Sequence, residues 1–111
     1  MKATLMVLAA GLGLMAVGAA GATVTQEQAM QLIKDKKLDC MACHVVDKKL
    51  VGPSWKEVGA KYRGHADAKA KLIEKVKKGG SGNWGNVPMT PHPTASDADL
   101  STLIGFILTL K

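Results

Sequence analysis

Two cysteines separated by two residues, Cys40 and Cys43, are followed directly by His44. This spacing is typical of a covalent attachment site for haem c. Each thiol can add across one vinyl group of the porphyrin, and a two-residue gap lets one short turn of backbone lie along that edge of the ring. The histidine is then placed so that an imidazole nitrogen can bind the iron. We therefore predict that Cys40 and Cys43 form two thioethers to one haem and that His44 is its proximal ligand.

Three other kinds of site could use the same pair of cysteines. A disulfide between Cys40 and Cys43 would close a very small loop and stabilise the chain little. A thiol–disulfide oxidoreductase also uses Cys-x-x-Cys, but in a βαβ context that this sequence lacks. A zinc site needs further ligands at matching spacing, and His65 and His92 are too scattered to supply them. The pattern favours haem, with the oxidoreductase as the main alternative.

Residues 79–94 contain a candidate for the second axial ligand of the iron. Their four glycines and three prolines exclude a regular helix, and a loop of this length in a small domain is usually functional. Met89 lies in this loop between Pro88 and Pro91. A methionine more often fills a core, but its position in a proline-flanked loop favours ligation through the thioether. We predict Met89 as the second axial ligand, with His92 as the alternative.

Four segments that would position these residues have the apolar spacing of helices, and the first, second and last of them also have N-terminal caps. They are residues 25–38, a short segment that follows Ser54, residues 67–78, and a last segment that follows Ser96. The last segment has apolar residues at helical spacing, namely Leu100, Leu103, Ile104, Ile107 and Leu108. No stretch alternates convincingly as a strand would. The sequence therefore predicts an all-α domain.

The N-terminal segment has the composition of a secretory signal peptide. Lys2 provides a minimal positive region, residues 3–19 are apolar and uncharged, and Ala20-Gly21-Ala22 fits the small-x-small cleavage pattern. We predict that residues 1–22 are removed and that residues 23–111 form one small domain in the bacterial periplasm, without stable membrane insertion. An uncleaved anchor is the alternative, since the apolar run is just long enough to span a bilayer.

The chain is basic, with a formal net charge of +6 that falls by one when Lys2 is removed. The lysines either steer the protein toward an acidic partner surface or form an ordinary solvated surface, and the sequence does not separate these interpretations. Nucleic-acid binding is not expected, because the chain has a single arginine, no recognised binding motif and an export signal. A monomer is the default expectation.

Together these features resemble the class I cytochromes c, and most closely the small bacterial cytochrome c-551/c-552 type. The resemblance covers nearly all of residues 23–111, and its core is Cys-Met-Ala-Cys-His with the segments 50–62 and 77–91. It implies a class I cytochrome c fold, with about four helices wrapped around one covalently attached haem c.

The resemblance also implies roles for single residues. Pro53 matches the family proline whose carbonyl accepts a hydrogen bond from the proximal imidazole, although it could be a simple turn proline. Trp84 matches the tryptophan that hydrogen-bonds a haem propionate, and Lys75 falls where relatives place a basic side chain near a propionate. Near relatives read Met-Pro-Pro-Asn where this chain has Met89-Thr90-Pro91-His92. Either His92 replaces the asparagine as donor to the methionine sulfur, or that bond is absent.

The function implied by the resemblance is that of a soluble periplasmic electron carrier, which exchanges single electrons with respiratory redox partners as one iron cycles between Fe(II) and Fe(III). Two protein ligands would leave no open position on the iron for a substrate, so no enzymatic activity is expected. One alternative is a thiol–disulfide oxidoreductase that uses free Cys40 and Cys43. The other is a haem enzyme or sensor whose sixth ligand dissociates easily.

Overall fold

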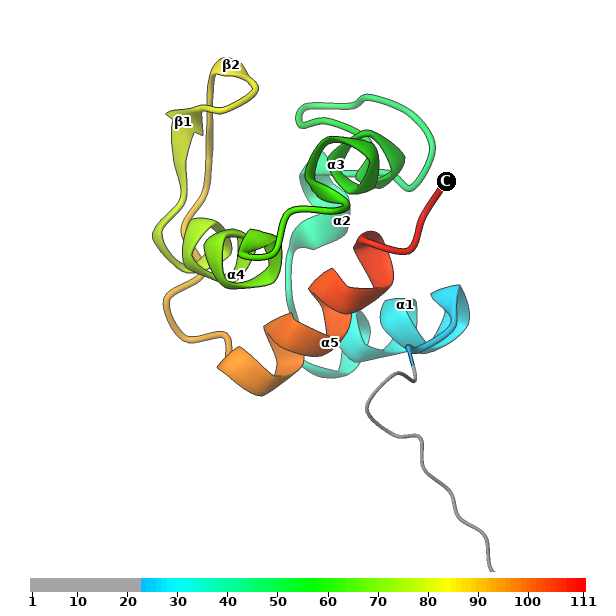
Figure 1. Cartoon of the computed structure of the whole chain (residues 1–111). Coiled ribbons are helices and arrows are strands. Elements are labelled where there is room, and N and C mark those ends of the chain that lie inside the picture. The colour runs from blue at the N-terminus through cyan, green and yellow to red at the C-terminus, as the bar shows by residue number, and fades with distance from the viewer. Residues whose placement is uncertain (1–22) are drawn as a thin grey trace, which may run out of the picture.

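A computed structural model describes residues 23–111, and the predicted signal peptide, residues 1–22, lies outside the described residues. Within the described part, five helices and one hairpin follow one another along the chain (Figure 1). They are α1 Gln26–Asp35, α2 Cys40–Cys43, α3 Trp55–Tyr62, α4 Ala68–Lys78, β1 Gly80–Gly82, β2 Gly85–Met89 and α5 Asp97–Ile107. No helix within residues 23–111 has the length and apolar composition needed to cross a lipid bilayer.

Three of the longer helices, α1, α3 and α5, begin where a polar side chain satisfies a free N–H group, whereas the start of α4 has no side-chain cap. At α1, the hydroxyl of Thr25 accepts a hydrogen bond from the N–H of Gln28, whose side chain accepts one from the N–H of Thr25. At α3 and at α5, a serine hydroxyl likewise accepts a hydrogen bond from a backbone N–H in the first turn. α1 ends at Asp35, earlier than the predicted limit at residue 38, and the chain turns away through Lys37, whose φ is 55°.

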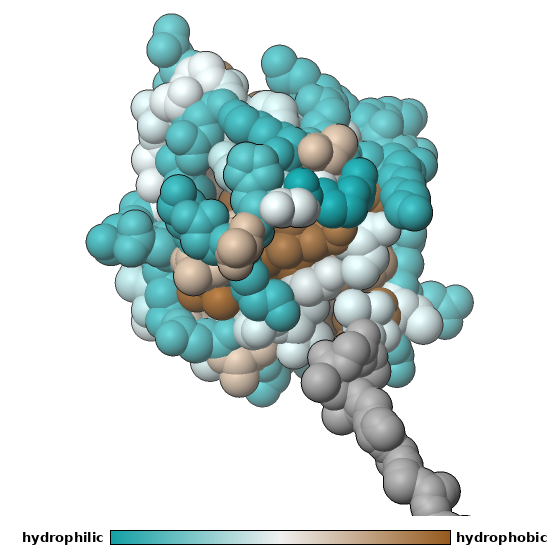
Figure 2. Space-filling model, in the orientation of Figure 1, coloured by the Kyte–Doolittle hydropathy of each residue, from teal (hydrophilic) through white to brown (hydrophobic). Residues whose placement is uncertain are grey.

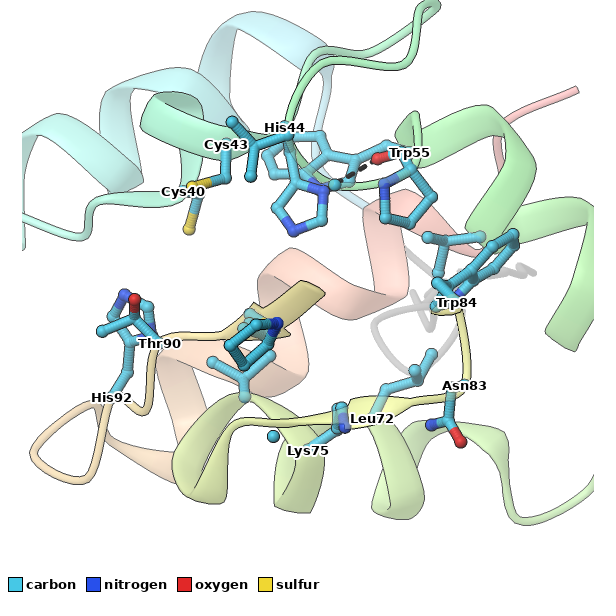
Figure 3. Close-up of a pocket in the computed structure, with 18 of the residues that line it drawn as sticks. Cys40, Cys43, His44, Trp55, Leu72, Lys75, Asn83, Trp84, Thr90 and His92 are labelled. Atoms are coloured by element: carbon cyan, nitrogen blue, oxygen red, sulfur yellow. Dashed lines mark hydrogen bonds between the residues drawn. The ribbon is translucent and has the colours of Figure 1, made fainter. Parts of the chain in front are cut away.

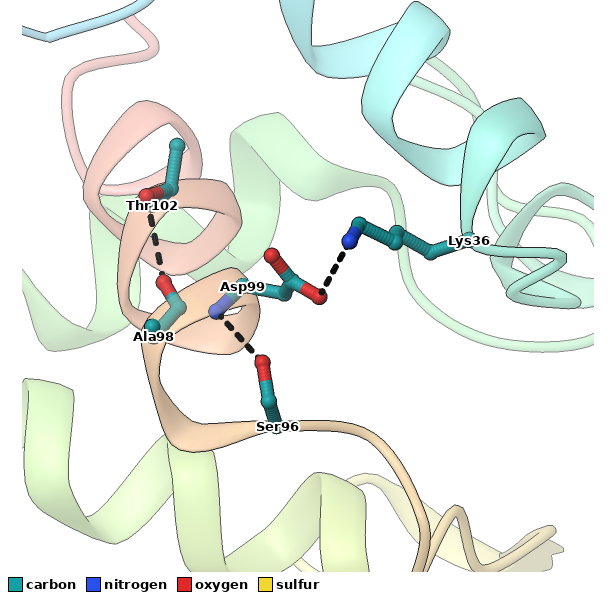
Figure 4. Close-up of polar contacts among 5 residues, drawn as sticks. All are labelled: Lys36, Ser96, Ala98, Asp99 and Thr102. Atoms are coloured by element: carbon teal, nitrogen blue, oxygen red, sulfur yellow. Dashed lines mark hydrogen bonds and ion pairs between the residues drawn. The ribbon is translucent and has the colours of Figure 1, made fainter.

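The start of α5 is tied to the end of α1 by a polar cluster (Figure 4). The N–H of Asp99 donates to the hydroxyl of Ser96 over 3.1 Å, and the Asp99 carboxylate lies 3.8 Å from the ammonium of Lys36. One turn later, the hydroxyl of Thr102 donates to the carbonyl of Ala98 over 3.1 Å. These contacts fix where α5 begins, and therefore which of its residues face the core.

The core lies where α5 packs against α1, α3 and α4. The residues of α5 that are buried are Leu100, Leu103, Ile104, Phe106 and Ile107. Leu108, which the sequence places on the same face, is only half-buried. Phe106 is buried in addition because it meets Trp55 of α3 edge to face, with ring centroids 6.4 Å apart. α5 therefore buries a wider arc than its predicted stripe.

The domain is mostly helical, as predicted, but the expectation that no segment forms a strand is wrong between residues 80 and 89. β1 and β2 pair antiparallel, with Gly80 opposite Met89 and Gly82 opposite Gly85. Nearly every residue of the two strands is exposed, so neither face requires an alternation of apolar and polar residues. The hairpin rises from the C-terminal end of α4 (Figure 1), and β2 ends on Met89.

Candidate functional site

All six residues that the sequence assigns to the haem site line one cavity, namely Cys40, Cys43, His44, Pro53, Trp84 and Met89. The cavity has a volume of about 310 Å³. α2 and the chain around His44 form one side, and α4 with the hairpin forms the other (Figure 3). Much of its wall is aliphatic, from Val58, Leu72, Val76, Leu103, Ile104 and Ile107. Figure 2 shows apolar side chains in the middle of one face, inside a hydrophilic rim.

α2 presents the two cysteines to this cavity. It is a single turn, closed by a hydrogen bond of 2.9 Å from the N–H of His44 to the carbonyl of Cys40. The two cysteines are not joined to each other by a disulfide. Burial raises the pKa of the Cys40 thiol to about 11. A redox-active dithiol requires the opposite, a thiolate stabilised near neutral pH, so this site does not favour a thiol–disulfide oxidoreductase.

The ring of His44 is held on three sides. Its Nδ1–H donates to the carbonyl of Pro53 over 2.8 Å, which leaves the Nε2 lone pair for a metal. Trp55 stacks on the ring with centroids 6.3 Å apart and planes inclined by 29°. On a third side lies Gly52, where an added Cβ would come within 2.7 Å of the His44 Cε1. These contacts orient the imidazole and fix its tautomer, with Nε2 on the cavity side (Figure 3).

The segment that carries Met89 is anchored to the last turn of α4 at two points. Gly79, at φ 69°, packs so closely on this segment that an added Cβ would lie only 2.8 Å from the nitrogen of Pro91. Further along, the N–H of His92 donates to the carbonyl of Val76 over 2.9 Å. Because both contacts lie within three residues of Met89 and Met89 also pairs with Gly80 of β1, half-buried Met89 is held where β2 meets the cavity.

Trp84, Lys75 and His92 lie along the rest of the cavity wall. Trp84, at the turn of the hairpin, is 39% exposed, and Lys75 of α4 lines the same cavity. His92 also lines it, and its Nδ1 is buried without a hydrogen-bond partner. An unpaired buried nitrogen costs about 1–3 kcal/mol, which indicates that a group beyond the polypeptide belongs beside it. Both interpretations of His92, as a donor to the methionine sulfur and as an alternative axial ligand, stay predictions.

The chemistry of these residues fits a haem. The aliphatic wall suits a porphyrin plane, the two thiols suit its vinyl groups, and an imidazole and a thioether reach one cavity from different segments of the chain. The indole N–H of Trp84 and the ammonium of Lys75 suit the propionates. Within residues 23–111, no three His, Cys, Asp or Glu side chains gather into a site for a bare metal ion.

Sequence reasoning did not assign Gly52, Trp55 or Lys61 to the site. Gly52 makes room for the imidazole and Trp55 supports it, while the ammonium of Lys61 lies over the ring of Trp84. The glycine before Pro53 is a weak signal for the first of these. The other two follow only from the packing of α3.

The chain is similar to known proteins over most of its length. The family model described as Cytochrome c matches residues 18–111. Cytochrome c-551 of Azotobacter vinelandii is 51% identical over 85 residues, which are 77% of this chain and 100% of the relative. Cytochrome c-552 of Hydrogenobacter thermophilus is 47% identical over 95 residues, which are 86% of this chain and 91% of the relative. The crystal structure of cytochrome c552 from Nitrosomonas europaea has a TM-score of 0.67 and 46% identity, covering 74% of this chain and 99% of that one.

Proposed function

Since the chain belongs to the cytochrome c family, we propose that Cys40, Cys43, His44 and Met89 hold the haem c by which it carries electrons in the bacterial periplasm. The class I cytochrome c fold, one covalently attached haem c and the role of a monohaem electron carrier come with that membership. The observation that supports the four residues is their convergence on a single cavity with an aliphatic wall.

Haem c, when bound, supplies an iron that changes between Fe(II) and Fe(III) by one electron. The residues of the chain determine how that couple is used. The carbonyl of Pro53 holds the Nδ1–H of His44 and so strengthens Nε2 as a donor. The aliphatic wall excludes water, which disfavours the more highly charged oxidised state and raises the potential. If His44 and Met89 both held the iron, the haem would offer no position to a substrate, and we propose that the protein is not an enzyme.

The surface of the protein supports brief contacts with redox partners. In the last turn of α4, Lys75 lines the cavity, whereas Lys77 and Lys78 form ion pairs with Asp97 and Glu74. Lysines near the mouth of the cavity would orient an acidic partner and raise its rate of association while adding little lasting affinity. We propose such acidic docking surfaces, a monomeric carrier, and export to the periplasm through cleavage of residues 1–22.

Replacing Met89 tests the assignment of the axial ligands. In Met89→Ala, the oxidised protein should lose the sulfur-to-iron charge-transfer band and bind imidazole at the vacated position. Met30→Ala is a matched control, because Met30 of α1 is also half-buried and packs on the core but does not line the cavity. An intact band in Met89→Ala, with imidazole binding no tighter than in the control, would remove Met89 from the site.

A further inference from the structure

The hairpin forms one wall of the cavity but has little support of its own. All of β1 and most of β2 are exposed. Gly80, Gly82 and Gly85 have positive φ, which glycine adopts readily, and they contribute no side chains to packing. Its base is anchored to α4 through Gly79. We define its tip as residues 83–84. The position of the tip is therefore set by contacts with elements outside the hairpin.

One side chain provides that support. Lys61, in the last turn of α3, donates from Nζ to the carbonyl of Asn83 over 2.9 Å. The same Nζ lies 4.4 Å from the ring centroid of Trp84. Within residues 23–111, this is the one side-chain hydrogen bond made to the hairpin. A single ammonium thus joins α3 on one side of the cavity to the tip on the other.

The positive charge of Lys61 strengthens both its hydrogen bond to Asn83 and its contact with the ring of Trp84. A hydrogen bond from an ammonium to a carbonyl is stronger than a neutral one, and a cation over an indole ring is attracted by its π face. Tyr62 adds a second ring, with its centroid 5.5 Å from the same Nζ. Lys75, the other lysine beside the hairpin, lies near Gly80 at the base and cannot replace Lys61 at the tip.

We propose that Lys61 is a positioning residue of the haem site, which fastens the hairpin tip to α3 and thereby holds Trp84 at the mouth of the cavity. The inference rests on the proposed function for what the cavity contains, whereas the fastening is a property of the chain alone. Without the ammonium the tip swings more freely about the base at Gly79. Water then reaches the cavity edge that Trp84 covers.

Three variants of the haem-loaded protein test this role. Lys61→Met keeps an aliphatic stem and removes the ammonium, and Lys61→Arg keeps a cation that can donate and stack. Lys56→Met is the matched control, because Lys56 is an exposed lysine of the same helix whose loss changes the net charge equally. Amide hydrogen exchange across residues 80–89 should be roughly fivefold faster in Lys61→Met, close to wild type in Lys61→Arg, and unchanged in Lys56→Met.

The reduction potential provides the second readout. It should fall further in Lys61→Met than in Lys56→Met, since both variants lose one charge but only the first opens the cavity edge to water. Equal exchange rates in these two variants would show that Lys61 does not hold the hairpin tip to α3. Equal reduction potentials would show that this contact does not affect the haem site. The proposed function fails by a different result, a purified protein without the absorption of haem, and hairpin exchange can be measured in that case as well.

Discussion

Replacing Gly79 with alanine should destabilise the protein and dislodge Met89. Gly79 has φ 69° and ψ −156°, a conformation that costs a residue with a Cβ about 1–3 kcal/mol. The added Cβ would also press on the carbonyl oxygen of Met89 and lie 2.8 Å from the nitrogen of Pro91. Backbone atoms cannot rotate aside, so overpacking adds about 1–3 kcal/mol. Together the free energy of unfolding should fall by about 2–6 kcal/mol, a large share of the usual 5–15.

A second glycine separates the two contributions. Gly64 has φ 89°, and nothing lies within 4 Å of a Cβ placed there, so Gly64→Ala introduces backbone strain without a clash. Urea unfolding of the haem-loaded variants should show the larger loss in Gly79→Ala. Only that variant should also weaken the sulfur-to-iron band of the oxidised protein. Equal losses in both variants, with the band intact in both, would refute the inference that Gly79 holds the Met89 segment in place.

Three further substitutions test other contacts. Gly52→Ala would bring a Cβ within 2.7 Å of the His44 ring, so haem absorbance per polypeptide should fall in the purified protein; unchanged loading would show that the ring does not need this space. Lys37→Gly relieves a φ of 55° after α1 and should raise the free energy of unfolding in urea by about 1 kcal/mol, and no gain would contradict it. Lys71 lowers the pKa of the Asp67 carboxyl by a hydrogen bond and by its charge. The pair therefore stabilises the folded protein at any pH above the pKa that Asp67 has in the unfolded chain. This contribution is lost as the pH falls through the lower pKa that Asp67 has in the folded protein. Thermal unfolding of Asp67→Asn should therefore show a deficit against wild type at neutral pH that disappears in acid, and a deficit independent of pH would contradict the pairing.

The helices were largely predictable because their signals are local. Ser96 is a side-chain cap, and the apolar residues after it recur at helical spacing, so the position of α5 follows from a few consecutive residues. α2 has only four residues and shows no periodicity, although its chemistry identifies both cysteines. The hairpin could not be predicted from a pattern, because exposed strands with glycines at positive φ have no buried face to reveal them.

The residues of the site likewise divide into those that the sequence predicts and those that it does not. The cysteines and the proposed ligands are predicted from residue type and spacing, because thioether formation and iron binding restrict which residues can serve. The supporting residues are not. That residue 52 must lack a side chain depends on where the ring of His44 lies, and that Lys61 matters more than the other lysines depends on the distance between α3 and the hairpin tip. Such contacts arise only when distant segments pack together.

The covalent attachment of one haem through Cys40 and Cys43 is the central claim, and the mass of the exported protein under denaturing conditions tests it most directly. We predict the mass of residues 23–111 plus one haem, with no thiol left to react with an alkylating reagent. The mass of the polypeptide alone, with both cysteines alkylated, would contradict the claim.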